Sequence, residues 1–327
     1  MIEQLQYTIS SWRPKIWSVS FLSILIKTLI LLGVVYYLVQ KLGSIDSIVA
    51  STITIQLQQL HSGFWLLGLI VLLMPFNWFL EAKKWQVLAK PFKKISISES
   101  FHGVLCGLSL GFVTPHALGD YAGKALSVDV SERKFMVAPI FVGRLSQMLM
   151  TLVFGFFGLN QVLLNNSTSW NTTNILLVMV LAIMLIFLVV RIFRKSIYRL
   201  MRKSKRYFTI LKEFSSDDYL KVIAFSAFRY LIFCSQFLLT LYLFDIPLST
   251  LILFYGVTWI FLIKSSLPSF NFLSDLGIRE FSAIYFFSFY GIDEILIVAA
   301  SLMLWLVNLL IPSLIGSFFI LKMKIFR

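Results

Sequence analysis

Two polar segments interrupt an otherwise apolar chain, and each offers an acid and a base four residues apart. In the first segment Asp120 precedes Lys124, and in the second Asp275 precedes Arg279. On a helix such residues share a face, where they can pair with each other or bind a charged ligand. Charged groups are costly at membrane depth, and they persist there when they are buried in protein or line a wet cavity. The two segments therefore predict a polar binding site within a membrane.

Each segment also carries a proline and a glycine. Thr114-Pro115 precedes Gly119 in the first segment, and Pro268 precedes Gly277 in the second. Proline cannot continue the preceding helix, and glycine permits a tight turn. We expect the first segment to turn at Gly119 and to begin a new helix at Asp120, because an acid is favourable at a helix start. Two interrupted helices, one in each half of a chain, are typical of a transport site near the bilayer midplane.

Both segments also have a plainer structural interpretation. The pair of Asp120 and Lys124 could serve only to pin a tight turn. The second segment could be a loop at the membrane surface whose charges are solvated. The sequence leaves these alternatives open.

The composition indicates a membrane protein. The chain has 327 residues, of which 58% are hydrophobic and 13% are charged, whereas soluble domains carry about 25% charged residues. The net charge of +14 comes mainly from two basic loops beside apolar spans, which is the positive-inside pattern and not a nucleic-acid footprint. The two cysteines lie in apolar runs and the three histidines are scattered, so we expect no metal and no cofactor.

The apolar runs predict an all-α polytopic protein with about six full spans. These lie at about 17–40, 63–80, 139–161, 175–190, 222–244 and 295–321. Lysines at 83–94 and the basic connector at 191–221 mark the inner side, and the uncharged loop at 165–174 marks the outer side.

An odd number of crossings must separate an inner loop from an outer loop. We therefore expect 100–130 and 248–291 to be re-entrant helical hairpins, although two full crossings in the second region would give the same parity. The halves at 17–161 and 175–321 then form an inverted-topology repeat within a single membrane domain. Both termini are expected in the cytoplasm, with the protein in the cell membrane.

Basic residues exceed acidic ones within the apolar regions. The cations are Lys124, Arg144, Arg229, Lys264 and Arg279, and the acids are Asp120, Asp275 and Glu280. This surplus suits an anionic lipid such as a phospholipid or an isoprenoid phosphate. Arg144 and Arg229 have a second interpretation as interfacial anchors that extend toward the membrane surface.

The ordered motifs resemble a known family. Gly111-Phe112-Val113-Thr114-Pro115, then Gly119-Asp120 and Lys124, are similar to the first motif of the lysylphosphatidylglycerol synthase membrane domain, or flippase-like superfamily. Pro268 followed by 277–280 is similar to its second motif, and Lys84-Trp85 and Arg144 also match. The chain departs from the pattern at 116–117, which lack the frequent arginine, and at 274–275, which replace a Gly-Gly pair.

The resemblance implies a lipid-translocating membrane domain. Some relatives add a soluble aminoacyl-transferase domain, which we do not expect here because Arg327 directly follows the last span. The candidate substrate-binding residues are Thr114, Pro115, Gly119, Asp120, Lys124, Arg144, Pro268, Gly277, Arg279 and Glu280.

Function remains open among three classes at this point. A flippase or transporter of anionic lipids without ATP hydrolysis is favoured, because the sequence has no P-loop. An intramembrane lipid-modifying transferase would need clustered carboxylates, and we predict no catalytic residues. A non-catalytic scaffold is the third option. The expected partners are membrane lipids and no nucleic acid, and a homo-oligomer is compatible with the sequence.

Overall fold

The computed structural model of the chain describes residues 47–58, 64–114, 118–128, 132–166, 209–267 and 272–322, together with residues 32 and 36. Every regular element in these ranges is helical. The α-helices are α3 (Ser47–Gln58), α4 (Phe64–Ala89), α5 (Ile97–Val113), α6 (Leu118–Ala125), α7 (Val137–Asn165), α11 (Ser216–Leu243), α12 (Thr250–Ser266), α13 (Phe272–Ser288), α14 (Glu294–Trp305) and α15 (Ile311–Lys322). A short 3₁₀ turn, η2 (Arg133–Met136), leads into α7, and a π-helical turn, η3 (Leu306–Leu310), joins α14 to α15.

Four helices of the described residues are long and apolar enough to cross a membrane. They are α4, α7, α11 and the continuous helix from Glu294 to Ile320. The 26 residues of α4 extend about 39 Å, which exceeds the ~30 Å hydrocarbon layer. These helices confirm four of the six predicted spans, and the predicted spans at 17–40 and 175–190 lie outside the described residues apart from residues 32 and 36.

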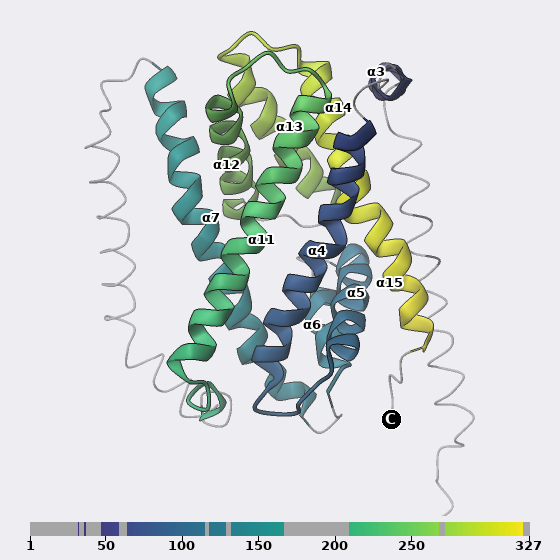
Figure 1. Cartoon of the computed structure of the whole chain (residues 1–327), viewed down its shortest axis with the longest axis vertical. Helices are drawn as coiled ribbons and strands as arrows, with labels where there is room; N and C mark the ends of the chain where they lie inside the picture. The colour runs from purple at the N-terminus through teal and green to yellow at the C-terminus, as the bar shows by residue number, and fades with distance from the viewer. Residues whose placement is uncertain are drawn as a thin grey trace, which may run out of the picture.

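Two helical hairpins lie between the long helices, at opposite ends of the molecule. The helices α5 and α6 occupy the lower half in Figure 1, and α12 and α13 occupy the upper half. The 17 residues of α5 and of α12 extend only about 26 Å each, so they are shorter than the bilayer core. The paired helices predicted from the sequence are therefore present, while the inverted repeat itself stays a prediction.

The first hairpin is closed by contact between two helix backbones. A Cβ atom added at Gly123 on α6 would lie 2.1 Å from the backbone nitrogen of Gly107 on α5. No other residue type leaves room for this approach. The tip is fixed by Thr114, whose hydroxyl donates to the carbonyl of Leu110 at 2.8 Å and accepts from the backbone N–H of Gly119 at 2.7 Å.

The second hairpin is packed by aromatic side chains. The indole of Trp259 on α12 donates to the carbonyl of Ser282 on α13 at 3.1 Å. Phe286 and Phe287 of α13 are fully buried against α12. The two hairpins therefore share a topology but not a mode of packing.

The last span changes its hydrogen-bond pattern in the middle. The π-helical turn at Leu306–Leu310 carries Asn308, whose side-chain oxygen accepts from the amide of Gln236 on α11 at 3.1 Å. Beyond this turn α15 lies against α5, where the Ser109 hydroxyl donates to the Ser313 carbonyl at 2.6 Å. The first hairpin is thus held between α4 and α15.

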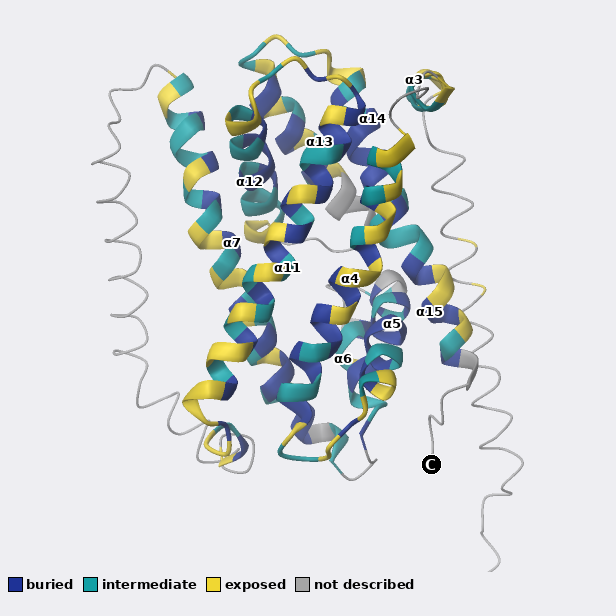
Figure 2. Ribbon diagram, viewed as in Figure 1, coloured by how far each residue is buried: buried dark blue, intermediate teal, exposed yellow. Residues whose placement is uncertain are grey.

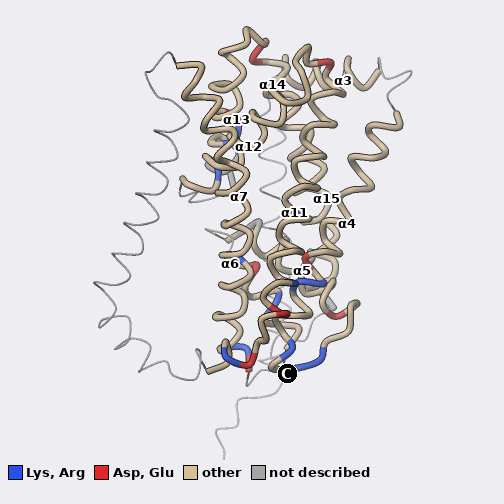
Figure 3. The backbone as a smooth tube through the Cα atoms, turned by 60° about the vertical axis from the view of Figure 1, so that its left-hand side comes forward, with Lys and Arg blue, Asp and Glu red and all other residues tan. Residues whose placement is uncertain are grey.

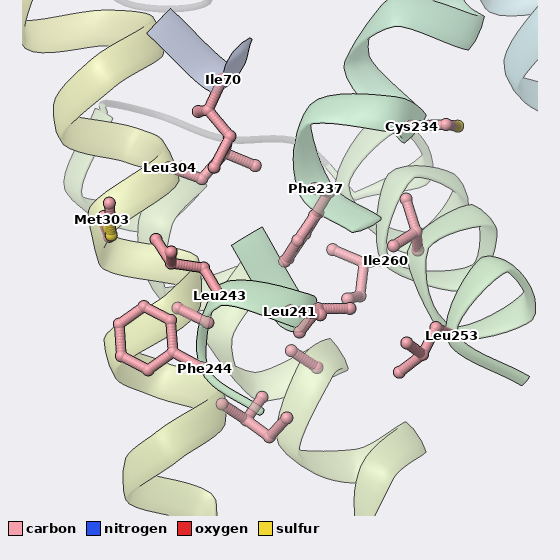
Figure 4. Packing of buried hydrophobic residues seen from close by; sticks show 14 of the residues in the cluster. Ile70, Cys234, Phe237, Leu241, Leu243, Phe244, Leu253, Ile260, Met303 and Leu304 are labelled. Carbon is pink, nitrogen blue, oxygen red and sulfur yellow. The ribbon is translucent and has the colours of Figure 1, made fainter. Parts of the chain in front are cut away.

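Buried side chains lie between the helices, and many exposed ones on the outer faces are apolar (Figure 2). This arrangement is expected where the surroundings are lipid. One apolar cluster fills the space between α11, α12 and α14, and Figure 4 shows part of it. A second cluster surrounds the first hairpin. Along α4 the first cluster ends at Trp78 and the second begins at Ala82, so Glu81 lies at the junction between them.

The structure corrects three local predictions. The second span does not end at Leu80, because α4 continues to Ala89 and includes residues that we assigned to a basic loop. The chain does not turn at Gly119, which lies inside α6; the interruption comes earlier, after Thr114. Gly277 does not form a turn either, since it lies within α13. Asp120 is in the first turn of a new helix, as predicted.

Candidate functional site

A cavity of about 440 Å³ lies between α4, α6, α7 and α11. Six charged residues line it: Glu81, Lys84, Asp120, Lys124, Arg144 and Arg229. Ser265, near the end of α12, also reaches the cavity, so the second hairpin contributes at its tip. The charged residues come from four different helices, and the fold alone brings them together.

Glu81 is the centre of this cluster. Its carboxylate lies 2.6 Å from the Nζ atom of Lys124 and 2.7 Å from the Nζ atom of Lys84, and it also accepts from the guanidinium of Arg229. The Glu81 side chain is only 8% exposed. A carboxylate this deeply buried needs cationic partners, and three helices each supply one.

Asp120 forms a second, more accessible group. Its carboxylate lies 3.0 Å from the Nζ atom of Lys124 and 3.3 Å from the guanidinium of Arg144. The predicted pair of Asp120 and Lys124 is therefore present. A Cβ atom at Gly107 would lie 2.9 Å from the Asp120 carboxylate, so the glycine of α5 makes room for this acid.

The two arginines of the cavity are held in defined orientations. The Nε atom of Arg229 donates to the side-chain oxygen of Asn77 at 2.9 Å, and the Asn77 amide donates to the backbone carbonyl of Arg229 at 3.4 Å. The guanidinium of Arg144 lies 4.5 Å from the ring centre of Tyr121. Both arginines therefore face the cluster, while their alternative interpretation as interfacial anchors stays a prediction.

The charges that line the cavity do not cancel. Four cations, Lys84, Lys124, Arg144 and Arg229, face two acids, Glu81 and Asp120, which leaves a formal charge of +2 among the described lining residues. Apolar residues, including Trp85, Leu88, Ile140 and Met148, complete the wall. The cavity can therefore hold a group that is anionic at one end and apolar at the other.

The structure brings first-half candidates together around the cavity, whereas the described second-half candidates are not among its lining residues. Asp120, Lys124 and Arg144 line the cavity, and Thr114 and Gly119 hold the hairpin that carries Asp120 and Lys124. In the second half Gly277 is exposed, Arg279 is buried and Glu280 is partly buried. None of these three is among the described residues that line the cavity. Pro115 and Pro268 lie outside the described residues.

Sequence reasoning missed two residues at the centre of the site. Glu81 and Lys84 follow directly after an apolar run, and we assigned Lys84 to an inner loop for that reason. Their spacing of three residues, which places both on one helix face, was a usable signal. The match of Lys84-Trp85 to the family pattern was a second signal in the sequence.

The described residues include no group of three or more His, Cys, Asp or Glu side chains that could hold a metal ion. Both carboxylates of the cavity are instead engaged by cations.

The chain matches a known family. The family model described as the lysylphosphatidylglycerol synthase TM region matches residues 21–316. A search of curated proteins found no match. The matched range contains both hairpins and every residue of the charged cluster.

Proposed function

Since this chain belongs to the family of the lysylphosphatidylglycerol synthase TM region, we propose that it binds the head group of an anionic lipid in the cavity between α4, α6, α7 and α11. The protein then moves this lipid between the two leaflets of the membrane. The family supports an integral membrane protein related to lipid handling, and the cavity supports the choice of an anionic head group.

The observation that carries the proposal is the formal charge of +2 among the described residues that line the cavity, which lies among helices long and apolar enough to cross a membrane. An uncompensated buried charge is costly, so an anionic ligand is favoured there. Arginine and lysine are the residues that most often bind phosphate in proteins.

The position of the cavity favours a lipid over a soluble anion. Met148 of α7 lines the cavity and is 51% exposed on the outer surface of the helix bundle. The neighbouring exposed residues of α7 are Leu145, Leu149 and Leu152, which form an apolar surface suited to acyl chains. A head group can occupy the cavity while its chains remain beside α7.

We propose the following arrangement in the membrane. The hairpins are re-entrant and enter from opposite sides, which is supported by their positions at opposite ends of the molecule (Figure 1). The end that carries most of the described lysines and arginines faces the cytoplasm of a cell-membrane protein (Figure 3). On this arrangement both termini lie in the cytoplasm and the two halves form an inverted repeat.

We propose that the protein is a transporter and not an enzyme. A lipid-modifying transferase needs a carboxylate that can act as a base or bind a metal. Glu81 and Asp120 each contact at least two cations, which disfavours both roles. No observation in the described residues favours the scaffold alternative.

Lipid scrambling in proteoliposomes tests the proposal. Purified protein is reconstituted with a fluorescent phosphatidylglycerol, and the fraction that reaches the inner leaflet is followed with a membrane-impermeant quencher. We expect Lys124→Ala and Arg144→Ala each to slow scrambling about tenfold or more, because each removes a cation from the cavity. Lys212→Ala, which removes an exposed cation outside the cavity, is the matched control.

All variants are first shown to be folded by size-exclusion chromatography in detergent. If Lys124→Ala and Arg144→Ala scramble at the rate of Lys212→Ala, the cavity is not the transport site.

A further inference from the structure

We infer that the cavity selects a phosphomonoester head group, which carries two negative charges, over a phosphodiester, which carries one. This inference rests on the proposed function and makes its ligand more specific. It concerns the chemistry of the group bound in the cavity, which a lipid or a soluble phosphomonoester can supply.

The charge of the cavity is the first argument. Among the described lining residues, four cations and two acids leave a surplus of two positive charges. A phosphomonoester carries about −1.5 to −2 at neutral pH. A phosphodiester leaves one positive charge uncompensated in a region where such a charge is costly.

The positions of the cations are the second argument. Lys84, Lys124, Arg144 and Arg229 lie on α4, α6, α7 and α11, so the donors approach the cavity from four helices. A phosphomonoester presents three terminal oxygens, whereas a phosphodiester presents two. The terminal group with more acceptors satisfies donors from more directions.

The two acids make the site selective as well as cationic. Glu81 fixes Lys84, Lys124 and Arg229, and Asp120 contacts Lys124 and Arg144. A ligand must compete for the cations with Asp120, the more exposed of the two acids. A dianion competes more effectively than a monoanion because each cation gains more electrostatic energy from it.

Binding to the purified full-length protein in detergent tests the inference at pH 8. The probes are a short-chain phosphatidic acid (a monoester), a phosphatidylglycerol of equal chain length (a diester) and soluble glycerol 3-phosphate. The second negative charge of phosphatidic acid is taken to lie roughly 6 Å from the surplus cations, at an effective dielectric constant near 20. We therefore expect phosphatidic acid to bind about tenfold more tightly than phosphatidylglycerol, or more.

Arg144→Gln provides the decisive variant, because it lowers the charge of the cavity to +1. We expect the affinity ratio of phosphatidic acid to phosphatidylglycerol to fall from about tenfold to roughly threefold, because the energy gained from the second ligand charge is proportional to the cavity charge, which is halved. Lys212→Gln makes the same change of charge on an exposed residue and should leave the ratio unchanged. If Arg144→Gln does not fold, the ratio measured on the parent protein decides the question alone.

The outcomes separate this inference from the proposed function. Equal affinity of the parent for phosphatidic acid and phosphatidylglycerol overturns the phosphomonoester inference, while lipid scrambling that depends on Lys124 still supports the proposed function. Glycerol 3-phosphate binding as tightly as phosphatidic acid supports the monoester and identifies a soluble source. Preferential binding of phosphatidic acid without any lipid scrambling supports the inferred chemistry and contradicts transport.

Discussion

Glu81 is expected to be the residue on which the stability of the charged cluster depends. Its buried carboxylate contacts Lys84, Lys124 and Arg229. Each attraction is worth about 4 kcal/mol at a separation of ~4 Å and an effective dielectric constant of ~20. The cost of removing the carboxylate from water offsets several kcal/mol of this gain. Removing one member of a buried ionic cluster typically costs about 3–5 kcal/mol.

Glu81→Gln should therefore lower the free energy of unfolding by about 4 kcal/mol, because three cations then face one another without their shared partner. At roughly 2 °C for each kcal/mol, the midpoint of thermal unfolding should fall by about 8 °C. Tryptophan fluorescence of the purified protein during heating in detergent measures this midpoint. Glu213→Gln, at an exposed acid, is the matched control and should change the midpoint by less than about 1 °C.

A second substitution tests the physical reason. Lys84→Gln combined with Glu81→Gln restores the formal charge of the cavity to +2, so the double variant should recover about half of the lost stability. The reasoning is refuted if Glu81→Gln is as stable as Glu213→Gln. It is equally refuted if the effects of the two substitutions simply add.

Three further predictions concern the hairpin, the topology and a surface cap. Gly123→Ala should abolish the monodisperse peak in size-exclusion chromatography, because its Cβ would lie 2.1 Å from a backbone nitrogen of α5, whereas Gly68→Ala, with nothing within 4 Å, should be tolerated. Cysteines introduced at Lys93 and Asn166 should react with an impermeant maleimide from opposite sides of the membrane, and labelling from one side would contradict the topology; the two native cysteines are buried and give little background. Hydrogen bonds from the residue that caps α5 hold the pKa of Glu99 below its usual range, so its stabilisation is full at neutral pH and is lost as pH falls through that lowered pKa. The difference in unfolding midpoint between the parent and Glu99→Gln should accordingly shrink between pH 7 and pH 3, and a constant difference would show that the carboxylate is not responsible.

The hairpins were predictable because their signals are local. The helix α5 ends at Val113, directly before the Thr114-Pro115 pair of the sequence, and Asp120 lies in the first turn of the next helix. The parity of crossings between inner and outer loops predicts an even number of passes in each region, which a re-entrant hairpin or, in the second region, two full crossings would satisfy. Such signals depend on proline geometry and on charge counts, which a single sequence contains.

The centre of the site was not predictable in the same way. Glu81 looks like the first residue beyond a span, because hydropathy alone cannot distinguish an interfacial acid from a buried one. The partners that keep it inside, Lys124 and Arg229, are 43 and 148 residues away along the chain. Ion pairs between distant helices leave no pattern in one sequence. The spacing of Glu81 and Lys84 on one helix face was a local signal that α4 extends beyond Leu80, but it does not identify their partners.

The role of Gly277 was misjudged for a related reason. A glycine before an arginine favours a turn when the segment is considered alone. In the structure α13 continues through Gly277, which is exposed and has no atom of another residue near its missing Cβ. A glycine within a helix costs only about 1 kcal/mol, and the aromatic packing of α13 against α12 outweighs that cost.

The acids of the cavity explain how a cationic site can exist before its ligand arrives. Without Glu81, the three cations that contact it would repel one another and would lose the one partner that they share. With it, the cations are already placed for an anion, so binding does not have to order them.

Asp120 is more exposed than Glu81, at 21% against 8%, and its contact with Arg144 is the longer one at 3.3 Å. We therefore expect an entering anion to displace Asp120 from Arg144 first and to leave the contacts of Glu81 intact. Asp120→Asn should then strengthen anion binding, whereas Glu81→Gln should weaken it by releasing the cations, and the same sign for both variants would exclude this division of roles.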